Sequence, residues 1–221
     1  MTIHSDPSTE ARLDALDRIG AIGYPTKRDE AWRHAPHRTL RELSFGPPVE
    51  LGTAVPADLD DQIPALDGPR VVVVNGAVDA SRSNLAGFDG LRLSTLAEVF
   101  AEHPEQVAAH FERADDDIAD VFVALNIAYG ADGAVVQVAD GVAFDAPIHI
   151  VDVELPDATQ NASCTGVVID IGAGSSATVI ETRIGAGTEF GGSNICTTIA
   201  LADDSTLEHV LLQDVPSSQV H

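Results

Sequence analysis

The two cysteines, Cys164 and Cys196, are the only soft metal ligands in the sequence. An iron–sulfur cluster is usually held by about four thiolates, so two thiols in one chain are too few to hold a cluster alone. Alternation along a strand places Cys196 on the face opposite Ile199, with Cys164 one strand earlier. Free cysteine is often buried as a small apolar residue. We therefore predict no catalytic, cofactor or metal site, and we keep Cys164 and Cys196 as weak metal candidates.

Three polar residues near the N-terminus have a spacing that could chelate zinc. Glu30, His34 and His37 would share one face of a continuous helix. Pro36 disfavours helix at the residue before it, so the pattern is broken. A polar surface is the favoured interpretation of this group.

Two further histidines, His149 and His209, lie in alternating runs typical of strands. For His209 a hydrogen-bonded core histidine is the favoured interpretation. The alternative function is a metal-binding β-helix or cupin-like enzyme that uses these histidines or the cysteines as ligands. Ligands of such an enzyme must converge in one pocket, whereas these residues are scattered along strands. No Ser-His-Asp order or nucleophile elbow stands out, so we predict that the chain is not an enzyme.

The charge balance excludes one class of partner. Twelve Lys and Arg residues face 35 Asp and Glu residues, a formal net charge of −23. Such a surface repels phosphate backbones, so nucleic acid is not expected as a partner. The sequence also lacks a signal peptide, an apolar run long enough to cross a bilayer and a disulfide framework. We therefore predict a cytoplasmic protein without a membrane partner.

The patterns divide the chain into four regions. Helical spacing fills the first, an acidic proline-rich linker the second, a hairpin followed by helices the third, and short alternating strands the fourth. The third region continues the N-terminal domain, and the fourth forms a separate β core. In order, the regions are residues 1–45, 46–70, 71–132 and 133–221.

Local signals position the elements of the first three regions. Residues 6–7 (Asp-Pro) are typical of a helix start, and residues 26–29 resemble a capping box that opens a second short helix. Residues 75–76 (Asn-Gly) supply the positive φ angles of a type I′ hairpin turn. Residues 95–98 (Thr to Glu) cap another helix, and a longer helix is expected over 118–129.

The fourth region repeats itself. An apolar pair followed by a turn recurs with a spacing of about 30 residues, and each copy continues into a second alternating run. The turn-ended segments are residues 136–141, 169–174 and 199–204, and the second runs are 146–153, 177–184 and 206–212. One copy cannot bury both sides of its strands, so copies must stack. The expected fold is α+β, with helices followed by a truncated right-handed parallel β-helix-like strand stack. Its exposed last edge could self-associate.

Four stretches together resemble the SufD family, the scaffold subunit of the Suf iron–sulfur cluster assembly system. They are Gly23-Tyr24-Pro25-Thr26-Lys27-Arg28-Asp29-Glu30-Ala31-Trp32-Arg33, Val73-Val74-Asn75-Gly76, Ala124-Leu125-Asn126-Ile127-Ala128-Tyr129 through Asp132-Gly133, and Leu207-Glu208-His209-Val210-Leu211-Leu212-Gln213.

The resemblance implies both partners and limits. SufD-family proteins are similar to SufB, pair with it through their β-helix cores and dock the SufC ATPase through a C-terminal helical region. They are not enzymes; the ATPase activity resides in SufC. Clusters form transiently at the interface of the full complex, and a reduced flavin is possible there. This chain corresponds to the N-terminal half of the family. The residues linked to cluster assembly lie beyond it, so none is assigned here and no cofactor is expected on this chain alone.

Overall fold

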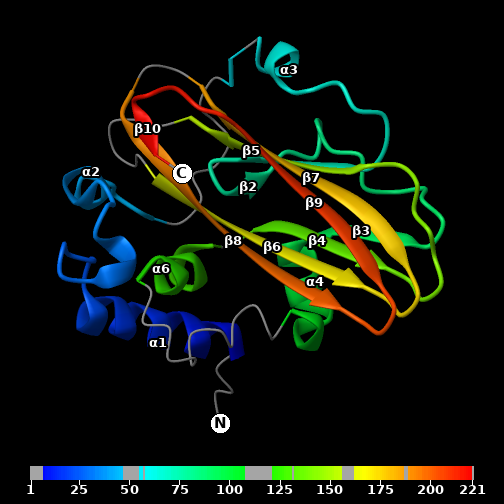
Figure 1. Cartoon of the computed structure of the whole chain (residues 1–221), viewed down its shortest axis with the longest axis horizontal. Helices are drawn as coiled ribbons and strands as arrows, with labels where there is room; N and C mark the ends of the chain where they lie inside the picture. Colours follow the sequence, from blue (N-terminus) through cyan, green and yellow to red (C-terminus); the bar gives the residue numbers. More distant parts are fainter. Residues whose placement is uncertain are drawn as a thin grey trace, which may run out of the picture.

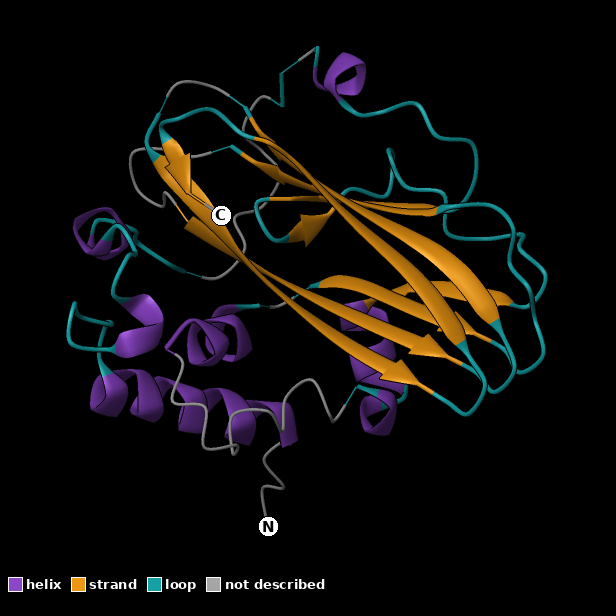
Figure 2. Ribbon diagram, viewed as in Figure 1, coloured by secondary structure: helices purple, strands orange, loops and turns teal. Residues whose placement is uncertain are grey.

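The structure of the 221-residue chain is a computed structural model. It describes residues 7–46, 55–56, 58–107, 121–130, 132–155, 162–186 and 189–220. Within these residues the chain folds into helices and two five-stranded sheets, so the predicted α+β class is confirmed (Figures 1 and 2). Parts of the predicted linker and the start of the predicted helix over 118–129 lie outside the described residues.

The two sheets are built mainly from parallel pairs. The first, here the β5 sheet, has the order β2 (Ala77–Val78), β1 (Arg70–Val74), β5 (Ile148–Glu154), β7 (Ser176–Gly185), β9 (Thr206–Asp214). The second, here the β6 sheet, has the order β10 (Gln219–Val220), β8 (Gly191–Leu201), β6 (Ala162–Ile171), β4 (Gly133–Val138), β3 (Leu91–Thr95). Among these strand pairs, β1–β2 and β3–β4 are antiparallel and the others are parallel.

Successive strands from β4 to β10 alternate between the two sheets, so each strand pairs with the strand two places away in sequence. Val136 lies opposite Ile169, and Ile169 lies opposite Ile199. In the β5 sheet, Val179 lies opposite both Ile148 and His209. The three predicted repeats therefore pair strand on strand, but the two sheets are not closed, and a right-handed parallel β-helix stays a prediction.

The turns between the sheets stack in the same way. Gly141, Gly174 and Asp204 occupy the third position of their turns, and all three have positive φ angles. The Gly141 amide donates to the Ala173 carbonyl, and the Gly174 amide donates to the Asp203 carbonyl. Glycine adopts this backbone conformation without steric cost, which explains why glycine stands in two of the three turns.

The main core lies between the sheets. Buried side chains from alternate strand positions meet there, among them Val71, Val73, Val136, Ile148, Ile150, Val167, Ile169 and Val179. These positions share one face of each strand because neighbouring side chains in a strand point to opposite faces.

Helices cover the outer face of the β6 sheet (Figures 1 and 2). They are α1 (Pro7–Ile22), η1 (Glu30–Trp32), α2 (His37–Arg41), α4 (Leu96–Glu102), η2 (Pro104–Gln106) and α6 (Val121–Tyr129). Ala15, Leu96 and Ile127 pack with Val135 and Val168 on that face. The Arg12 guanidinium donates to the Ala128 and Gly130 carbonyls, which ties α1 to the end of α6.

The two predicted capping boxes have different outcomes. Thr95 and Glu98 form the predicted capping box of α4. The second short helix is only the three-residue η1, which begins after Asp29. Thr26 is not its N-cap, and the predicted capping box is wrong. Instead the Asp29 carboxylate accepts hydrogen bonds from the Thr26 amide and hydroxyl. These bonds close a turn that precedes η1.

The segment predicted as a surface linker contributes to the core. The short helix α3 (Leu59–Gln62) lies against the outer face of the β5 sheet, where Leu59 and Ile63 are buried with Val72 and Val151. The hairpin, predicted to belong to the N-terminal domain, supplies β1, which pairs with β5. The strand stack therefore begins with β1, and the helical and strand regions share their packing surfaces.

None of the helices in the described residues combines the length and apolar composition that a bilayer crossing needs.

Candidate functional site

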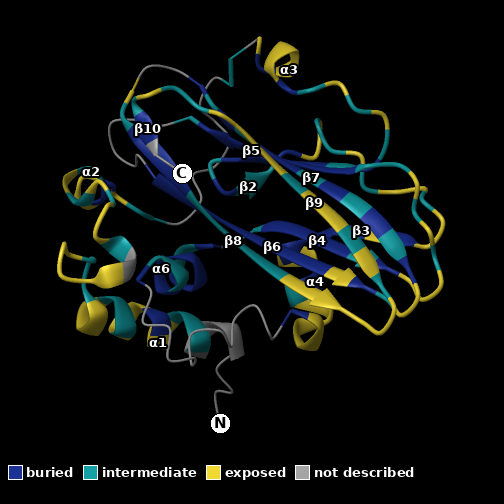
Figure 3. Cartoon of the chain, in the orientation of Figure 1, coloured by how far each residue is buried: buried dark blue, intermediate teal, exposed yellow. Residues whose placement is uncertain are grey.

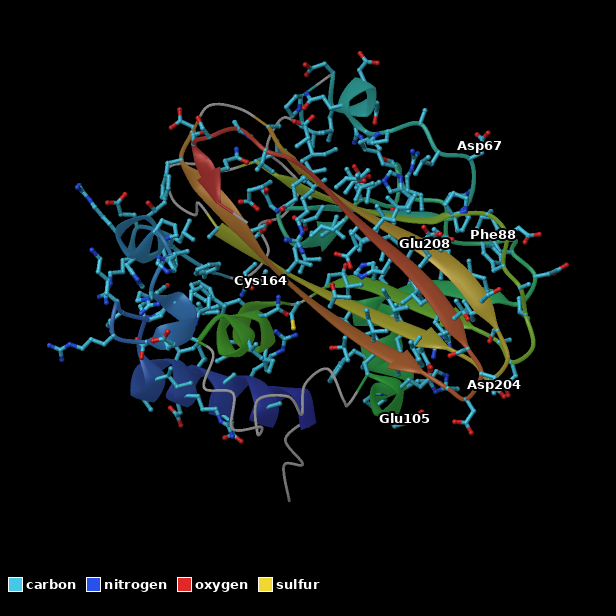
Figure 4. The ribbon with its side chains drawn as sticks, in the orientation of Figure 1. Asp67, Phe88, Glu105, Cys164, Asp204 and Glu208 are labelled. Atoms are coloured by element: carbon cyan, nitrogen blue, oxygen red, sulfur yellow. The ribbon has the colours of Figure 1, made fainter. Side chains whose placement is uncertain are left out.

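The two cysteines lie on the outer face of the β6 sheet. Cys164 is buried beside α6, and its thiol donates to the Leu125 carbonyl at 3.5 Å (Figure 4). Cys196 is half-buried on β8, opposite Gly166. Burial raises the pKa of the Cys164 thiol, so this thiol stays protonated at neutral pH. The thiolate is the form that binds metals, so the position does not favour a ligand role for Cys164.

The two strand histidines point to opposite faces of the β5 sheet. His149 is buried on the outer face, where its Nε2 lies 2.8 Å from the Thr182 hydroxyl. Burial, with a smaller effect of Arg70, lowers the pKa of His149 to about 4. His209 lies on the inner face, with Nε2 2.8 Å from Glu181 Oε1. The structure therefore does not bring these histidines together with each other or with the cysteines.

The N-terminal group also fails to converge. Because η1 ends at Trp32, no continuous helix aligns Glu30, His34 and His37. Glu30 pairs with Arg33 at 3.4 Å, and His37 Nδ1 lies 3.1 Å from the Pro25 carbonyl oxygen. Across the described parts of the chain, no group of three or more His, Cys, Asp or Glu residues is placed to hold a metal ion.

Asn75, from the hairpin motif, holds two strands in register. It occupies the left-handed region, with φ of 49°, and its backbone amide donates to the Val153 carbonyl. Its side-chain amide donates to the Leu155 carbonyl at 2.9 Å, and the Leu155 amide donates back to Asn75 Oδ1 at 2.7 Å. The side chain thus continues the β1–β5 ladder after β1 ends.

The Asp132-Gly133 motif joins three elements. The Asp132 carboxylate accepts hydrogen bonds from the amides of Val78 at 3.2 Å, Ala97 at 3.2 Å and Gly133 at 2.9 Å. These bonds connect β2, the start of α4 and the start of β4. Gly133 has φ of 151°, and a Cβ added there would overlap the Gly166 carbonyl oxygen. Only glycine fits at this position.

Asn126, in the α6 motif, fastens that helix to the sheet. Its side-chain amide donates to the carbonyls of Thr165 at 3.0 Å and Asn194 at 2.8 Å. These carbonyls belong to the neighbouring strands β6 and β8. The polar residues described in these three motifs therefore act as structural ties.

A set of polar side chains on the inner strand faces was not predicted from the sequence, apart from His209. His209 makes a side-chain hydrogen bond, as predicted, but it is exposed, so its predicted core position is wrong. We call this set the inner polar row. It occupies the same strand faces as the apolar core, and some members, such as Glu181 opposite Ile150 and Thr197 opposite Val167, lie directly beside core residues. Its members are Asp152, Glu154, Ser163, Thr165, Glu181, Arg183, Ser193, Thr197 and His209. The signal was present in β5, where Ile148, Ile150, Asp152 and Glu154 share one face and change from apolar to acidic.

Hydrogen bonds link the inner polar row across the two sheets. The Thr165 hydroxyl donates to Asp152 at 2.7 Å, and the Ser163 hydroxyl donates to Glu154. Burial raises the pKa of both carboxyls above its ordinary value, because a buried carboxylate loses its hydration.

Glu181, a third carboxylate of the row, has several partners. It accepts a hydrogen bond from the Thr197 hydroxyl at 2.9 Å and lies 2.8 Å from His209 Nε2. Its other oxygen is 3.9 Å from Arg183 Nη2. Hydrogen bonds from Thr197 and His209 compensate the buried charge of Glu181.

One end of the inner polar row meets a cavity of about 180 Å³, which we call the Trp32 pocket. Its lining includes the polar residues Arg183 and Ser193 and the apolar residues Trp32, Leu43, Phe45 and Phe122. Pockets for drug-sized ligands typically have volumes of about 300–1,000 Å³. The residues of this pocket therefore do not fit a flavin, whose three fused rings and side chain need more room.

The last two long strands form an exposed surface, which we call the exposed rung. Ile199, Leu201, Leu211 and Leu212 are 42%, 53%, 46% and 43% exposed. Figure 3 shows β9 and the end of β8 as largely exposed, and Figure 4 places Asp204 at the turn between them and Glu208 on β9. Ile199, Leu201 and Leu211 lie on the inner face of their strands, in line with buried core residues of the preceding strands. The inner core is therefore uncovered at these strands.

Comparison with known proteins gives two findings. Residues 3–150 match the family model described as the SufBD protein N-terminal region. Over 148 residues the chain is 26% identical to an iron–sulfur cluster assembly SufBD family protein of Synechocystis sp. (strain ATCC 27184 / PCC 6803 / Kazusa). The alignment covers 67% of this chain but 33% of that relative, so the chain spans about a third of the relative it matches.

Proposed function

Because the chain belongs to the SufBD family, we propose that it is part of a SufD-type scaffold subunit for iron–sulfur cluster assembly. Its expected partners are a SufB-like protein and a SufC-like ATPase, in the cytoplasm. The relative's description supports cluster assembly as the process, since it names iron–sulfur cluster assembly for that protein.

The exposed rung is the observation that carries this proposal. Three apolar side chains of the inner rows, Ile199, Leu201 and Leu211, are each more than two-fifths exposed. Strand edges with exposed apolar side chains are normally covered in native proteins. In the proposed subunit the stack continues as a right-handed parallel β-helix, and its later turns present the surface that pairs with SufB.

A scaffold acts through protein contacts, and the chemistry of this chain is consistent with that role. The cluster is cargo, formed transiently at the interface of the full complex, and ATP hydrolysis belongs to the SufC-like partner. A buried, protonated Cys164 and a half-buried Cys196 supply no thiolate set for a resident cluster. A flavin, if the complex holds one, would bind outside the Trp32 pocket.

Co-purification tests the proposal. The full-length polypeptide that carries this sequence is co-expressed with SufB-like and SufC-like proteins, and a tag on one subunit is used to recover the others. We expect a stable complex of all three. Recovery of the tagged subunit without either partner would overturn the proposal.

Metal analysis separates the scaffold from the metal-enzyme alternative. Protein purified without chelators is assayed for zinc and iron. The scaffold predicts amounts well below one metal per chain. Stoichiometric metal that is lost when His149 or His209 is replaced by glutamine would instead support the enzyme.

A further inference from the structure

The Trp32 pocket is lined by a cationic side chain, Arg183, and by the aromatic rings of Trp32, Phe45 and Phe122. Arg183 comes from β7 of the inner polar row, and its Nε is buried without a hydrogen-bond partner among the described residues. The Glu181 carboxylate is 3.9 Å from Arg183 Nη2, which is beyond hydrogen-bond distance. Glu181 is also already bonded to Thr197 and His209. The Nε–H of Arg183 therefore lacks an acceptor, and Arg183 is one of the residues that line the cavity.

A buried donor without an acceptor is uncommon in folded proteins, because losing its hydration without replacement costs free energy. A guanidinium presents parallel N–H groups that match the two oxygens of a carboxylate. Asp152 lies opposite Arg183 on β5, but its Oδ1 accepts the hydrogen bond from the Thr165 hydroxyl. The polar side of the pocket thus suits a small planar anion, despite the acidic surface of the chain.

The apolar side selects the rest of the ligand. The rings of Trp32 and Phe122 have centroids 5.1 Å apart, and those of Phe45 and Phe122 are 6.4 Å apart. Aromatic faces and edges favour contact with another ring. A cavity of about 150 Å³ accommodates benzene in another protein, so about 180 Å³ leaves room for one ring and a short polar group.

We propose that the Trp32 pocket binds a small monocyclic aromatic carboxylate, with its ring against Trp32 and Phe122 and its carboxylate on Arg183. The site is independent of the proposed scaffold function, since its lining includes none of the exposed apolar side chains of the exposed rung, Ile199, Leu201, Leu211 and Leu212.

Benzoate is the probe that tests the site on the intact chain. Trp32 is the single tryptophan, so its fluorescence reports on the pocket alone, and calorimetry gives the stoichiometry. We expect saturable binding of one benzoate per chain. Benzyl alcohol, which keeps the ring and loses the charge, should bind about 10- to 100-fold more weakly, as expected for loss of a charge-assisted hydrogen bond. Acetate, which lacks the ring, should leave Trp32 fluorescence unchanged.

Substitutions locate the binding. Arg183→Gln should weaken benzoate binding about 10- to 100-fold and leave benzyl alcohol unaffected. Arg38→Gln is the matched control, because the Arg38 side chain is 94% exposed on α2 and does not line the pocket. Leu43→Phe fills the cavity and retains Arg183, so it should abolish binding of both benzoate and benzyl alcohol. This variant keeps the test informative if Arg183→Gln does not fold. Equal affinity for benzoate and benzyl alcohol, or unchanged benzoate binding in Leu43→Phe, would overturn the proposal.

Discussion

The buried carboxyl of Glu154 should make the stability of the strand stack depend on pH. Glu154 is 1% exposed and lies between the sheets, where it accepts a hydrogen bond from the Ser163 hydroxyl. Burial raises the pKa of this carboxyl well above 4.5, and the nearby Asp152 raises it further, although the hydrogen bond from Ser163 opposes them. The folded protein therefore keeps a proton on Glu154 at pH values where the unfolded chain has lost it.

The size of the effect follows from proton linkage. At pH values below the unfolded pKa, both states carry the proton and the stabilising contribution is fully present. As the pH rises from the unfolded pKa to the folded pKa, the free energy of unfolding falls by about 1.4 kcal/mol per pH unit for this group. Above the folded pKa the loss is complete. The slope is measurable because the whole free energy of unfolding of a typical domain is only about 5–15 kcal/mol.

Glu154→Gln isolates this contribution. Glutamine is close in shape, and its carbonyl oxygen can still accept the hydrogen bond from Ser163, but it has no proton to lose. Urea unfolding of both proteins between about pH 4.5 and pH 8 gives the free energy of unfolding at each pH. The wild-type curve should fall more steeply, by about 1.4 kcal/mol per pH unit over part of the range. The difference in free energy of unfolding by which the wild type exceeds the variant should be smallest at the alkaline end of the range.

A matched control separates burial from net charge. Glu208→Gln removes one carboxyl from an exposed position on β9, so it changes the net charge equally. It should leave the slope of the wild-type curve unchanged. If Glu154→Gln and the wild type share the same slope, Glu154 is ionised inside the fold and the reasoning about the inner polar row is wrong.

Three further predictions concern the structural ties and the exposed rung. Gly133→Ala should prevent folding or cost more than about 3 kcal/mol by chemical unfolding, whereas Gly141→Ala, with φ of 70° and open space around it, should cost about 1–2 kcal/mol. Asn75→Gly keeps the backbone angle but removes two side-chain hydrogen bonds, so the free energy of unfolding should fall by about 1–3 kcal/mol. An unchanged free energy of unfolding would show that the hydrogen bonds between Asn75 and Leu155 do not stabilise the fold. If the isolated chain self-associates through the exposed rung, Leu201→Lys with Leu211→Lys should abolish the concentration-dependent increase in size seen by sedimentation, and persistent association would place the contact elsewhere.

Local signals in the sequence were sufficient to predict those elements whose structure depends on residues close together in the sequence. The hairpin at Asn75 and the capping box at Thr95 depend on residues within four positions, and both were predicted. The repeat was also predicted, because stacking places each copy on the previous one in the same register. Those features need no knowledge of the rest of the chain.

Long-range pairing was out of reach of the same reasoning. Nothing near β1 indicates that it pairs with β5, more than 70 residues later, or that Leu59 is buried on the outer face of that sheet. Proline and aspartate around α3 suggested a linker, yet a few buried apolar side chains are enough to fix a short helix on a sheet. Tertiary packing overrode local composition there.

The inner polar row shows why pattern-based prediction also missed the most unusual part of the interior. Alternation predicts apolar side chains inside and polar side chains outside, and this rule is correct for Ile148 and Ile150. It fails two residues later, where Asp152 and Glu154 continue the same inward face. Natural sequences tend to break such rules where a site or a strained arrangement is maintained at a cost in stability. Because the break leads along the strands to Arg183 and the Trp32 pocket, the buried acids and the proposed anion site are two parts of one departure from an ordinary core.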